Sequence, residues 1–191
     1  MIYIITALSS EAKPLIHHYR LKRNTDVDFL LYESDTVFLC ITQVGYNNAL
    51  HVSGKFLEYK KPAEDDILVN IGLCGAPESY NIGELLVIEK LCFKDREALL
   101  TCRESLHVKA SLTTLIQEQY ENLNKVVDME AFGIYERAKE FFKINQLLFV
   151  KIVSDHFEPK SLTKNLAYGL INRNIKEITS LIKRSTLCQQ R

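Results

Sequence analysis

The sequence predicts an α/β protein with a largely parallel or mixed sheet and helices on both faces. Two observations support this class. Short apolar runs rich in β-branched residues alternate with amphipathic segments through most of the 191 residues. Three of these runs, at residues 2–8, 67–71 and 147–153, are apolar at nearly every position, which is typical of central strands covered on both faces. The chain has no internal repeat or linker, so residues 1–191 are expected to form a single domain.

The elements are expected in the following order. Residues 2–8 form the first strand, and Glu11 lies in the first turn of the next helix, where the dipole favours a negative charge and Ser9 or Ser10 is the expected cap. Further strands are expected at residues 29–43 (two strands with a turn at 34–35), 67–71, 84–92, 99–102, 125–128 and 147–154. Further helices are expected at residues 47–59, 111–120, 130–142 and about 165–185.

The bulk composition excludes several classes of partner. Lys plus Arg and Asp plus Glu number 24 each, which gives no electrostatic reason to expect a nucleic acid or a membrane surface. No apolar run approaches the roughly 20 residues needed to span a bilayer. The five cysteines form no CxxC pair, and Cys40, Cys74 and Cys92 are expected to be small buried hydrophobes in a reduced compartment. We therefore expect a cytoplasmic protein.

Three carboxylates, Glu11, Glu130 and Asp155, each follow a separate apolar run. Open α/β sheets bind ligands at the carboxyl ends of their strands, so one cleft at one sheet edge could hold all three. A carboxyl group at a half-buried strand end, such as Asp155, loses hydration, and this favours the protonated form that a general acid needs. Glu130 could accept two hydrogen bonds from a vicinal diol such as that of ribose.

Each of these residues also has a purely structural interpretation. Asp155 could cap the loop before Pro159. Glu11 and Glu130 could be helix N-terminal residues stabilised by the dipole alone. Met129 could lie under a sugar ring or simply pack in the core.

Two glycine-containing stretches, at residues 45–48 and 72–75, would let a ligand approach the backbone closely. Both could equally be tight turns. His156 is adjacent to Asp155 and could line the same cleft.

Five segments carry a resemblance to a known superfamily and together span nearly the whole chain. They are IITALSSE (4–11), VGYNNA (44–49), NIGLCGA (70–76), VDMEA (127–131) and VKIVSD (150–155). In this order they resemble the nucleoside phosphorylases and nucleosidases, and they look most like the 5′-methylthioadenosine/S-adenosylhomocysteine nucleosidases. The resemblance implies a three-layer αβα sandwich with a central twisted mixed sheet, a homodimer, and action on a small-molecule nucleoside in methionine salvage. It implies no metal and no organic cofactor.

The resemblance also implies roles for particular residues. Asp155 would protonate N7 of the purine, and Glu11 would orient and deprotonate the attacking water. Glu130 and Met129 would hold the ribose. The remaining substrate-binding positions that the resemblance implies are Gly75, Ser154, Lys151 and Leu106.

Water is the implied nucleophile. Phosphorylases of this superfamily hold phosphate with arginines and a serine, and the segment at residues 70–73 has lost the arginine and the serine at the matching positions. Glu11 would also repel phosphate. The resemblance therefore favours hydrolysis of an N-glycosidic bond.

Several departures from the pattern leave two alternatives open. Leu73 stands where nucleosidases have a serine. Lys151 stands where they have an arginine, which keeps the charge but loses the fork geometry. A long middle stretch of the family is cut to a few residues, and Ser105 falls where a base-stacking phenylalanine is expected, with His107 two residues later. The alternatives are a phosphorylase with an altered phosphate site and a catalytically inactive nucleoside-binding homologue.

Overall fold

The computed structural model describes residues 1–101 and 107–187. Within these ranges the strands are β1 (Ile2–Thr6), β2 (Lys22–Asn24), β3 (Leu30–Glu33), β4 (Val37–Ile41), β5 (Ile67–Gly75), β6 (Leu85–Phe93), β7 (Arg96–Leu99), β8 (Val108–Thr114), β9 (Val126–Asp128) and β10 (Leu147–Asp155). The helices are α1 (Ser9–Tyr19), α2 (Tyr46–Lys60), α3 (Ala131–Ala138) and α4 (Lys164–Leu187), with short 3-10 helices η1 (Ile144–Gln146) and η2 (Pro159–Ser161).

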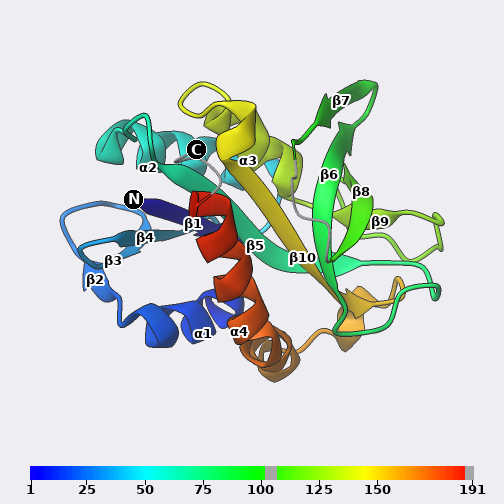
Figure 1. The fold of residues 1–191 in the computed structure, drawn as a ribbon. Coiled ribbons are helices and arrows are strands. Elements are labelled where there is room, and N and C mark those ends of the chain that lie inside the picture. Colours follow the sequence, from blue (N-terminus) through cyan, green and yellow to red (C-terminus); the bar gives the residue numbers. More distant parts are fainter. Residues whose placement is uncertain (102–106, 188–191) are drawn as a thin grey trace.

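The strands belong to one mixed sheet, as the sequence predicts. Strands β4, β1, β5 and β10 run parallel to one another, and β3 and β2 extend this part antiparallel. On the other side, β5, β10, β6, β8 and β9 pair in turn and return to β5, so the pairings close a ring of five strands. Strand β7 forms a hairpin with β6 (Figure 1), and Arg96 of β7 contacts Tyr46 of α2 and Glu136 of α3. The closed ring leaves few free strand edges on this side.

Helices cover both faces of the sheet, which confirms the three-layer prediction. Helices α1 and α4 pack on one face, and α2 and α3 pack on the other (Figure 1). In β1, Ile4 packs in the core cluster that contains Leu15 of α1, whereas Ile5 packs in the cluster that contains Phe56 of α2. Because successive side chains of a strand point to opposite faces, a continuously apolar strand serves two cores.

The helix predicted over residues 111–120 is wrong. This stretch contains the end of strand β8, in which Ala110, Leu112 and Thr114 are buried in alternation between β6 and β9. Pairing with two neighbouring strands overrides the helical spacing of Leu112, Leu115 and Ile116 in the sequence. The remaining residues, from Leu115 to 120, form a loop.

Other boundaries differ from those expected. Strand β5 continues through residues 72–75, so this stretch is part of a buried strand and not a turn. Strand β7 precedes the expected 99–102, helix α3 ends at Ala138, and the short strand β2 is an addition. The expected cap at Ser9 or Ser10 is also wrong, because α1 begins at Ser9 and its N-cap is Leu8.

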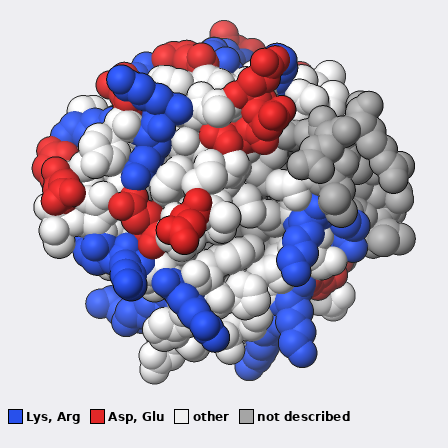
Figure 2. Space-filling model, turned by 60° about the vertical axis from the view of Figure 1, so that its left-hand side comes forward, with Lys and Arg blue, Asp and Glu red and all other residues white. Residues whose placement is uncertain are grey.

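The cysteines and the charged surface agree in part with expectation. Cys40 and Cys74 are free and buried, but Cys92 is half-buried. Cys102 and Cys188 lie outside the described residues. Acidic and basic side chains both appear on the face drawn in Figure 2, with uncharged surface between them. Across the described residues, no helix combines the length and the apolar character that crossing a membrane requires.

Candidate active site

The carboxyl ends of the parallel strands β1, β4, β5 and β10 meet at one edge of the sheet. Glu11 follows β1, Asp155 ends β10, and Glu130 follows β9, whose Val127 pairs with Gly75 at the end of β5. The three carboxylates line one cavity of ≈ 280 Å³. Their exposures are 3% for Glu11, 8% for Glu130 and 7% for Asp155. The convergence expected from the sequence is therefore present.

Backbone amides fix both carboxylate oxygens of Glu11. Ala7 N–H and Leu8 N–H donate to Oε2 at 3.0 and 2.8 Å, and Leu73 N–H of β5 donates to Oε1 at 3.0 Å. Burial raises the pKa of Glu11, while these hydrogen bonds and the charge of Lys151 oppose that rise. Glu11 thus caps its own helix and also ties the end of β1 to β5.

Glu130 is the N-cap residue of α3 and reaches across to the start of α2. Its Oε1 accepts a hydrogen bond from Gly45 N–H at 2.7 Å. Gly45 has φ 103°, a left-handed conformation that glycine adopts without steric cost. Burial and the neighbouring charge of Asp128 raise the pKa of Glu130 to about 7, against the opposing charge of Lys151.

Lys151 lies beneath the cavity and balances these carboxylates. Its side chain is buried, and its Nζ is 2.9 Å from Asp128 Oδ2. Lys151 is in register with Gly72 of β5, where an added Cβ would lie 3.1 Å from Nζ and 3.5 Å from Glu11 Oε1. Burial alone would lower the pKa of Lys151, but the charges of Asp128, Glu130 and Glu11 raise it above its usual value. The ammonium group therefore stays charged.

Asp128 is a buried residue of the site that the sequence reasoning did not single out. Its Oδ1 accepts a hydrogen bond from Thr114 Oγ1 at 2.7 Å, and its Oδ2 accepts one from Ala131 N–H at 2.8 Å. Thr114 Oγ1 in turn accepts a hydrogen bond from Phe132 N–H at 3.0 Å. These bonds hold the first turn of α3 and hence position Glu130. The signal in the sequence was Lys151, since a lysine inside an apolar strand requires a buried carboxylate partner.

A β-bulge directs Asp155 into the cavity. Val153 is in register with Cys74 and Asp155 with Gly75, so Ser154 is the additional residue. Asp155 Oδ1 accepts a hydrogen bond from Glu158 N–H at 2.9 Å. A Cβ on Gly75 would lie 3.5 Å from this same oxygen, at ordinary van der Waals distance, so Gly75 lies directly against the carboxyl group.

Ser154 can serve both protonation states of Asp155. Its Oγ lies 2.6 Å from Asp155 Oδ2 and 3.1 Å from the carbonyl oxygen of Cys74. The hydroxyl has one hydrogen, so it can donate to only one of these oxygens at a time. Toward an ionised Asp155 it donates to the carboxylate. Toward a protonated Asp155 it can accept a hydrogen bond from the carboxyl O–H and donate its own to the carbonyl oxygen of Cys74.

The other cavity walls are mostly apolar. Met129 lines the cavity together with Leu73, Leu115 and Leu162. Phe157 also lines it and is buried with φ 67°, a conformation that is uncommon for a bulky residue. The sequence reasoning missed Phe157, and its backbone conformation has no signal in the sequence. Leu106, an implied substrate-binding residue, lies outside the described residues, as does Ser105.

Two histidines considered for the site point elsewhere. His156 Nδ1 is 2.9 Å from the carbonyl oxygen of Ala76, and His156 is not among the described residues that line the cavity. His107 Nε2 is 2.8 Å from Glu177 Oε1 on α4. These contacts therefore support neither His156 as a residue that lines the cavity nor His107 as a residue that stacks on a base. Within the described residues, no group of three or more His, Cys, Asp or Glu is arranged to hold a metal ion.

Together, the mixed sheet, the two helical layers and the cavity at the strand ends define a nucleoside phosphorylase-like α/β fold. The chain is similar to the 5′-methylthioadenosine nucleosidase of Arabidopsis thaliana, with 19% identity and a TM-score of 0.81 over 96% of this chain and 95% of that one. It is also similar to a nucleosidase from S. pneumoniae with a transition-state inhibitor, MT-ImmA, with 15% identity and a TM-score of 0.76 over 95% and 98%. The MTAN of Chlamydia trachomatis gives 18% identity and 0.69 over 94% and 97%.

The comparisons confirm, at the level of the fold, the resemblance to these nucleosidases. No protein-family model matches the sequence, and no curated protein matches it. At these identities the comparisons support the fold alone, so only the geometry of this chain can support roles for individual residues.

Proposed function

We propose that this protein hydrolyses the N-glycosidic bond of a purine nucleoside of the 5′-methylthioadenosine/S-adenosylhomocysteine type. The observation that carries the proposal is the meeting of the buried residues Glu11, Glu130 and Asp155 in one cavity, although they come from three separate elements. Binding a nucleoside alone would not require an acid and a base on the same cavity. Catalysis of glycosidic cleavage requires both.

Asp155 would act as the general acid. As the bond between C1′ and the base nitrogen breaks, its electron pair moves into the purine, which takes the proton from Asp155 at N7. The sugar then carries positive charge, which the carboxylates of Glu11 and Glu130 stabilise. Ser154 keeps a hydrogen-bond partner for Asp155 before and after proton transfer.

Glu11 would act as the general base. It takes a proton from water as the water oxygen bonds to C1′, so one proton leaves Asp155 and one arrives at Glu11. Burial raises the pKa of Glu11, which makes its carboxylate a stronger base than an exposed glutamate. Glu130 would accept hydrogen bonds from the ribose diol, with Met129 beside the sugar and Phe157 against the base.

Water is favoured over phosphate as the nucleophile by the charges of the cavity. Among the described residues that line it are five carboxylates and no Arg or Lys (Glu11, Glu118, Asp128, Glu130 and Asp155). A phosphate ion would be repelled and would lack charge-assisted hydrogen bonds. The homodimer and the place in methionine salvage stay predictions from the resemblance.

Release of free base tests the proposal. The protein is incubated with 5′-methylthioadenosine, S-adenosylhomocysteine, adenosine and inosine, with and without phosphate, and the products are separated by chromatography. We expect release of base that does not depend on phosphate. Release that requires phosphate would assign a phosphorylase. Binding without any release would assign a nucleoside-binding protein.

Asp155→Asn tests the role of the acid. The variant keeps the shape of the side chain and an oxygen that can accept the hydrogen bond from Glu158 N–H. We expect turnover to fall by at least about a hundredfold, the usual contribution of a general acid. Glu158→Gln is the matched control, because the side chain of Glu158 is exposed and its hydrogen bond to Asp155 comes from the backbone N–H. Equal losses in the two variants would refute the role.

A further inference from the structure

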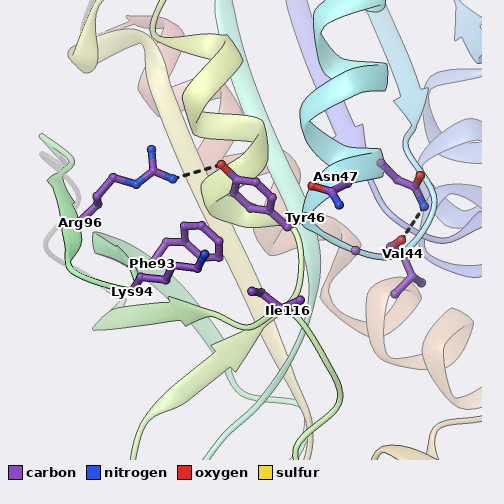
Figure 3. Close-up of a pocket in the computed structure, with 9 residues that line it drawn as sticks. Val44, Tyr46, Asn47, Phe93, Lys94, Arg96 and Ile116 are labelled. Atoms are coloured by element: carbon purple, nitrogen blue, oxygen red, sulfur yellow. Dashed lines mark hydrogen bonds between the residues drawn. The ribbon is translucent and has the colours of Figure 1, made fainter.

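A second cleft, with a volume of ≈ 700 Å³, opens beside the catalytic cavity. It lies between the start of α2 and the turn that joins β6 to β7. Figure 3 shows Tyr46 projecting from α2 toward Phe93 and Lys94, with Ile116 beside them. The rings of Tyr46 and Phe93 are stacked with centroids 4.2 Å apart and an interplanar angle of 6°. Arg96 Nη2 donates a hydrogen bond to Tyr46 Oη at 3.2 Å.

The cleft carries positive charge. Lys94 and Arg96 line it, and no Asp or Glu is among its described lining residues. Arg96 Nη1 is 2.8 Å from Glu136 Oε2, but the other oxygen of Glu136 is 3.0 Å from Lys139 Nζ. One carboxylate thus faces two cations, and Lys94 adds a third. Lys94 Nζ lies 5.4 Å from the centroid of the Phe93 ring, whose side chain is itself buried, so Lys94 is held over the aromatic wall of the cleft.

The cleft and the catalytic cavity share a rim. Val44 lines both of them. Gly45 lines the cleft while its N–H donates to Glu130 of the cavity. Ile116 lines the cleft, and its neighbours on either side in the chain, Leu115 and Gln117, line the cavity. A chain that leaves the cavity past residues 44–45 therefore enters the cleft.

The position of the ribose determines which part of the substrate reaches the cleft. With C1′ between Asp155 and Glu11 and with the 2′ and 3′ hydroxyls on Glu130, the substituent at C5′ is the part left to leave the cavity. At ≈ 280 Å³ the cavity is about the smallest size that ligand sites usually have. A long 5′ substituent would need the second cleft.

Building on the proposed function, we propose that the protein selects nucleosides whose 5′ substituent ends in a carboxylate and lacks an ammonium group. The cavity is lined by carboxylates, whereas the cleft is lined by cations and stacked rings, so an anionic tail is repelled from the first and attracted to the second. A zwitterionic tail gains less, because its ammonium group finds no carboxylate among the described residues of the cleft.

Three analogues of equal length test this selectivity. They are 5′-thioadenosines whose sulfur carries a 3-carboxypropyl, a 3-aminopropyl or a butyl group. We expect kcat/KM to be highest for the carboxypropyl compound and lowest for the aminopropyl compound, with at least about a tenfold difference between these two. The difference should shrink in 0.5 M salt, because exposed charges are screened.

Lys94→Gln and Lys13→Gln form the matched pair of variants. We expect Lys94→Gln to lower the ratio of kcat/KM for the carboxypropyl compound to that for the butyl compound by about fivefold, the effect of one partly solvated charge pair. Lys13 is exposed on α1, on the opposite face of the sheet, and its replacement should leave the ratio as it is. A ratio near one in the wild type, or equal effects of the two variants, would overturn the selectivity.

Failure of the selectivity and failure of the proposed hydrolysis are distinguishable. If the butyl compound is hydrolysed as well as the carboxypropyl compound, the hydrolysis stands and the selectivity is wrong. If none of the compounds is hydrolysed, calorimetric titration of the same three compounds still ranks their affinities. The carboxypropyl compound binding most tightly would then support the cleft's selectivity, and any other order would overturn it.

Discussion

The cavity that holds Glu11, Glu130 and Asp155 and the neighbouring cleft differ in the sign and the burial of their charges. In the cavity, carboxylates are buried at strand ends and balanced by a buried ammonium group, that of Lys151. In the cleft, Lys94 and Arg96 extend into solvent from a hairpin turn and rest on stacked aromatic rings. Charges in the first are strongly coupled to one another and to folding. Charges in the second are screened by water and salt, and we expect them to affect affinity more than stability.

Lys151→Met should give the largest effect on stability. It leaves Asp128, Glu130 and Glu11 buried without their common counterion, and breaking a buried ion pair costs about 3–5 kcal/mol. The control is Lys143→Met, which breaks an ion pair with Glu64 whose two side chains are exposed. Urea unfolding at pH 7 should show a large loss for the first variant and almost none for the second. Similar losses would contradict the contrast between buried and exposed charges.

The pH dependence of stability should follow Glu130. Its pKa is raised from 4.5 to about 7 in the folded protein, so the folded state holds the proton more tightly than the unfolded chain does. This contribution is present at pH 4.5 and below and is lost as pH rises through about 7. Acting alone it amounts to roughly 3 kcal/mol.

Glu130→Gln isolates this contribution. The difference in unfolding free energy between wild type and Glu130→Gln, measured in urea at pH 5 and pH 7.5, should move against the wild type at the higher pH. Glu121→Gln, at an exposed position, should show no such change. A difference that is constant with pH would contradict the shifted pKa.

Gly133→Ala should produce an intermediate loss of stability. A Cβ at Gly133 would lie 2.6 Å from the carbonyl oxygen of Tyr46, so α3 would have to move away from the start of α2. We expect a loss of about 1–3 kcal/mol in urea unfolding. Gly169→Ala in α4 is the control, because its Cβ would meet no atom within 4 Å and alanine favours the helix by up to about 1 kcal/mol. Equal changes would argue against close packing of the two helices.

Tyr46→Phe should have the smallest effect. It removes the hydroxyl that accepts the hydrogen bond from Arg96 but keeps the ring stacked on Phe93. Because the bond is exposed, we expect almost no shift in the urea midpoint. A large shift would mean that the cleft is part of the folding core.

The sequence was sufficient for the parts of the molecule that depend on local pattern. Apolar runs predicted β1, β5 and β10, and carboxylates after such runs predicted that Glu11, Glu130 and Asp155 meet. The strand β8 was not predictable in this way, because Leu112, Leu115 and Ile116 also fit a helical period and only pairing with β6 and β9 decides between them.

Local sequence pattern also did not predict which charged side chains balance one another in the cavity. Lys151 and Asp128 are separated in the chain, and their ion pair lies against Gly72, where an added Cβ would be 3.1 Å from Lys151 Nζ. Lys151 in an apolar strand indicates that a buried carboxylate partner exists, but the sequence does not show that this partner is Asp128.

A crystal structure of the Asp155→Asn variant with 5′-methylthioadenosine tests the central claim most directly. We expect purine N7 within about 2.6–3.2 Å of residue 155, both ribose hydroxyls on Glu130, and the methylthio group directed past Gly45 toward the second cleft. A nucleoside bound elsewhere, or one whose ribose turns away from Glu11 and Glu130, would contradict the account.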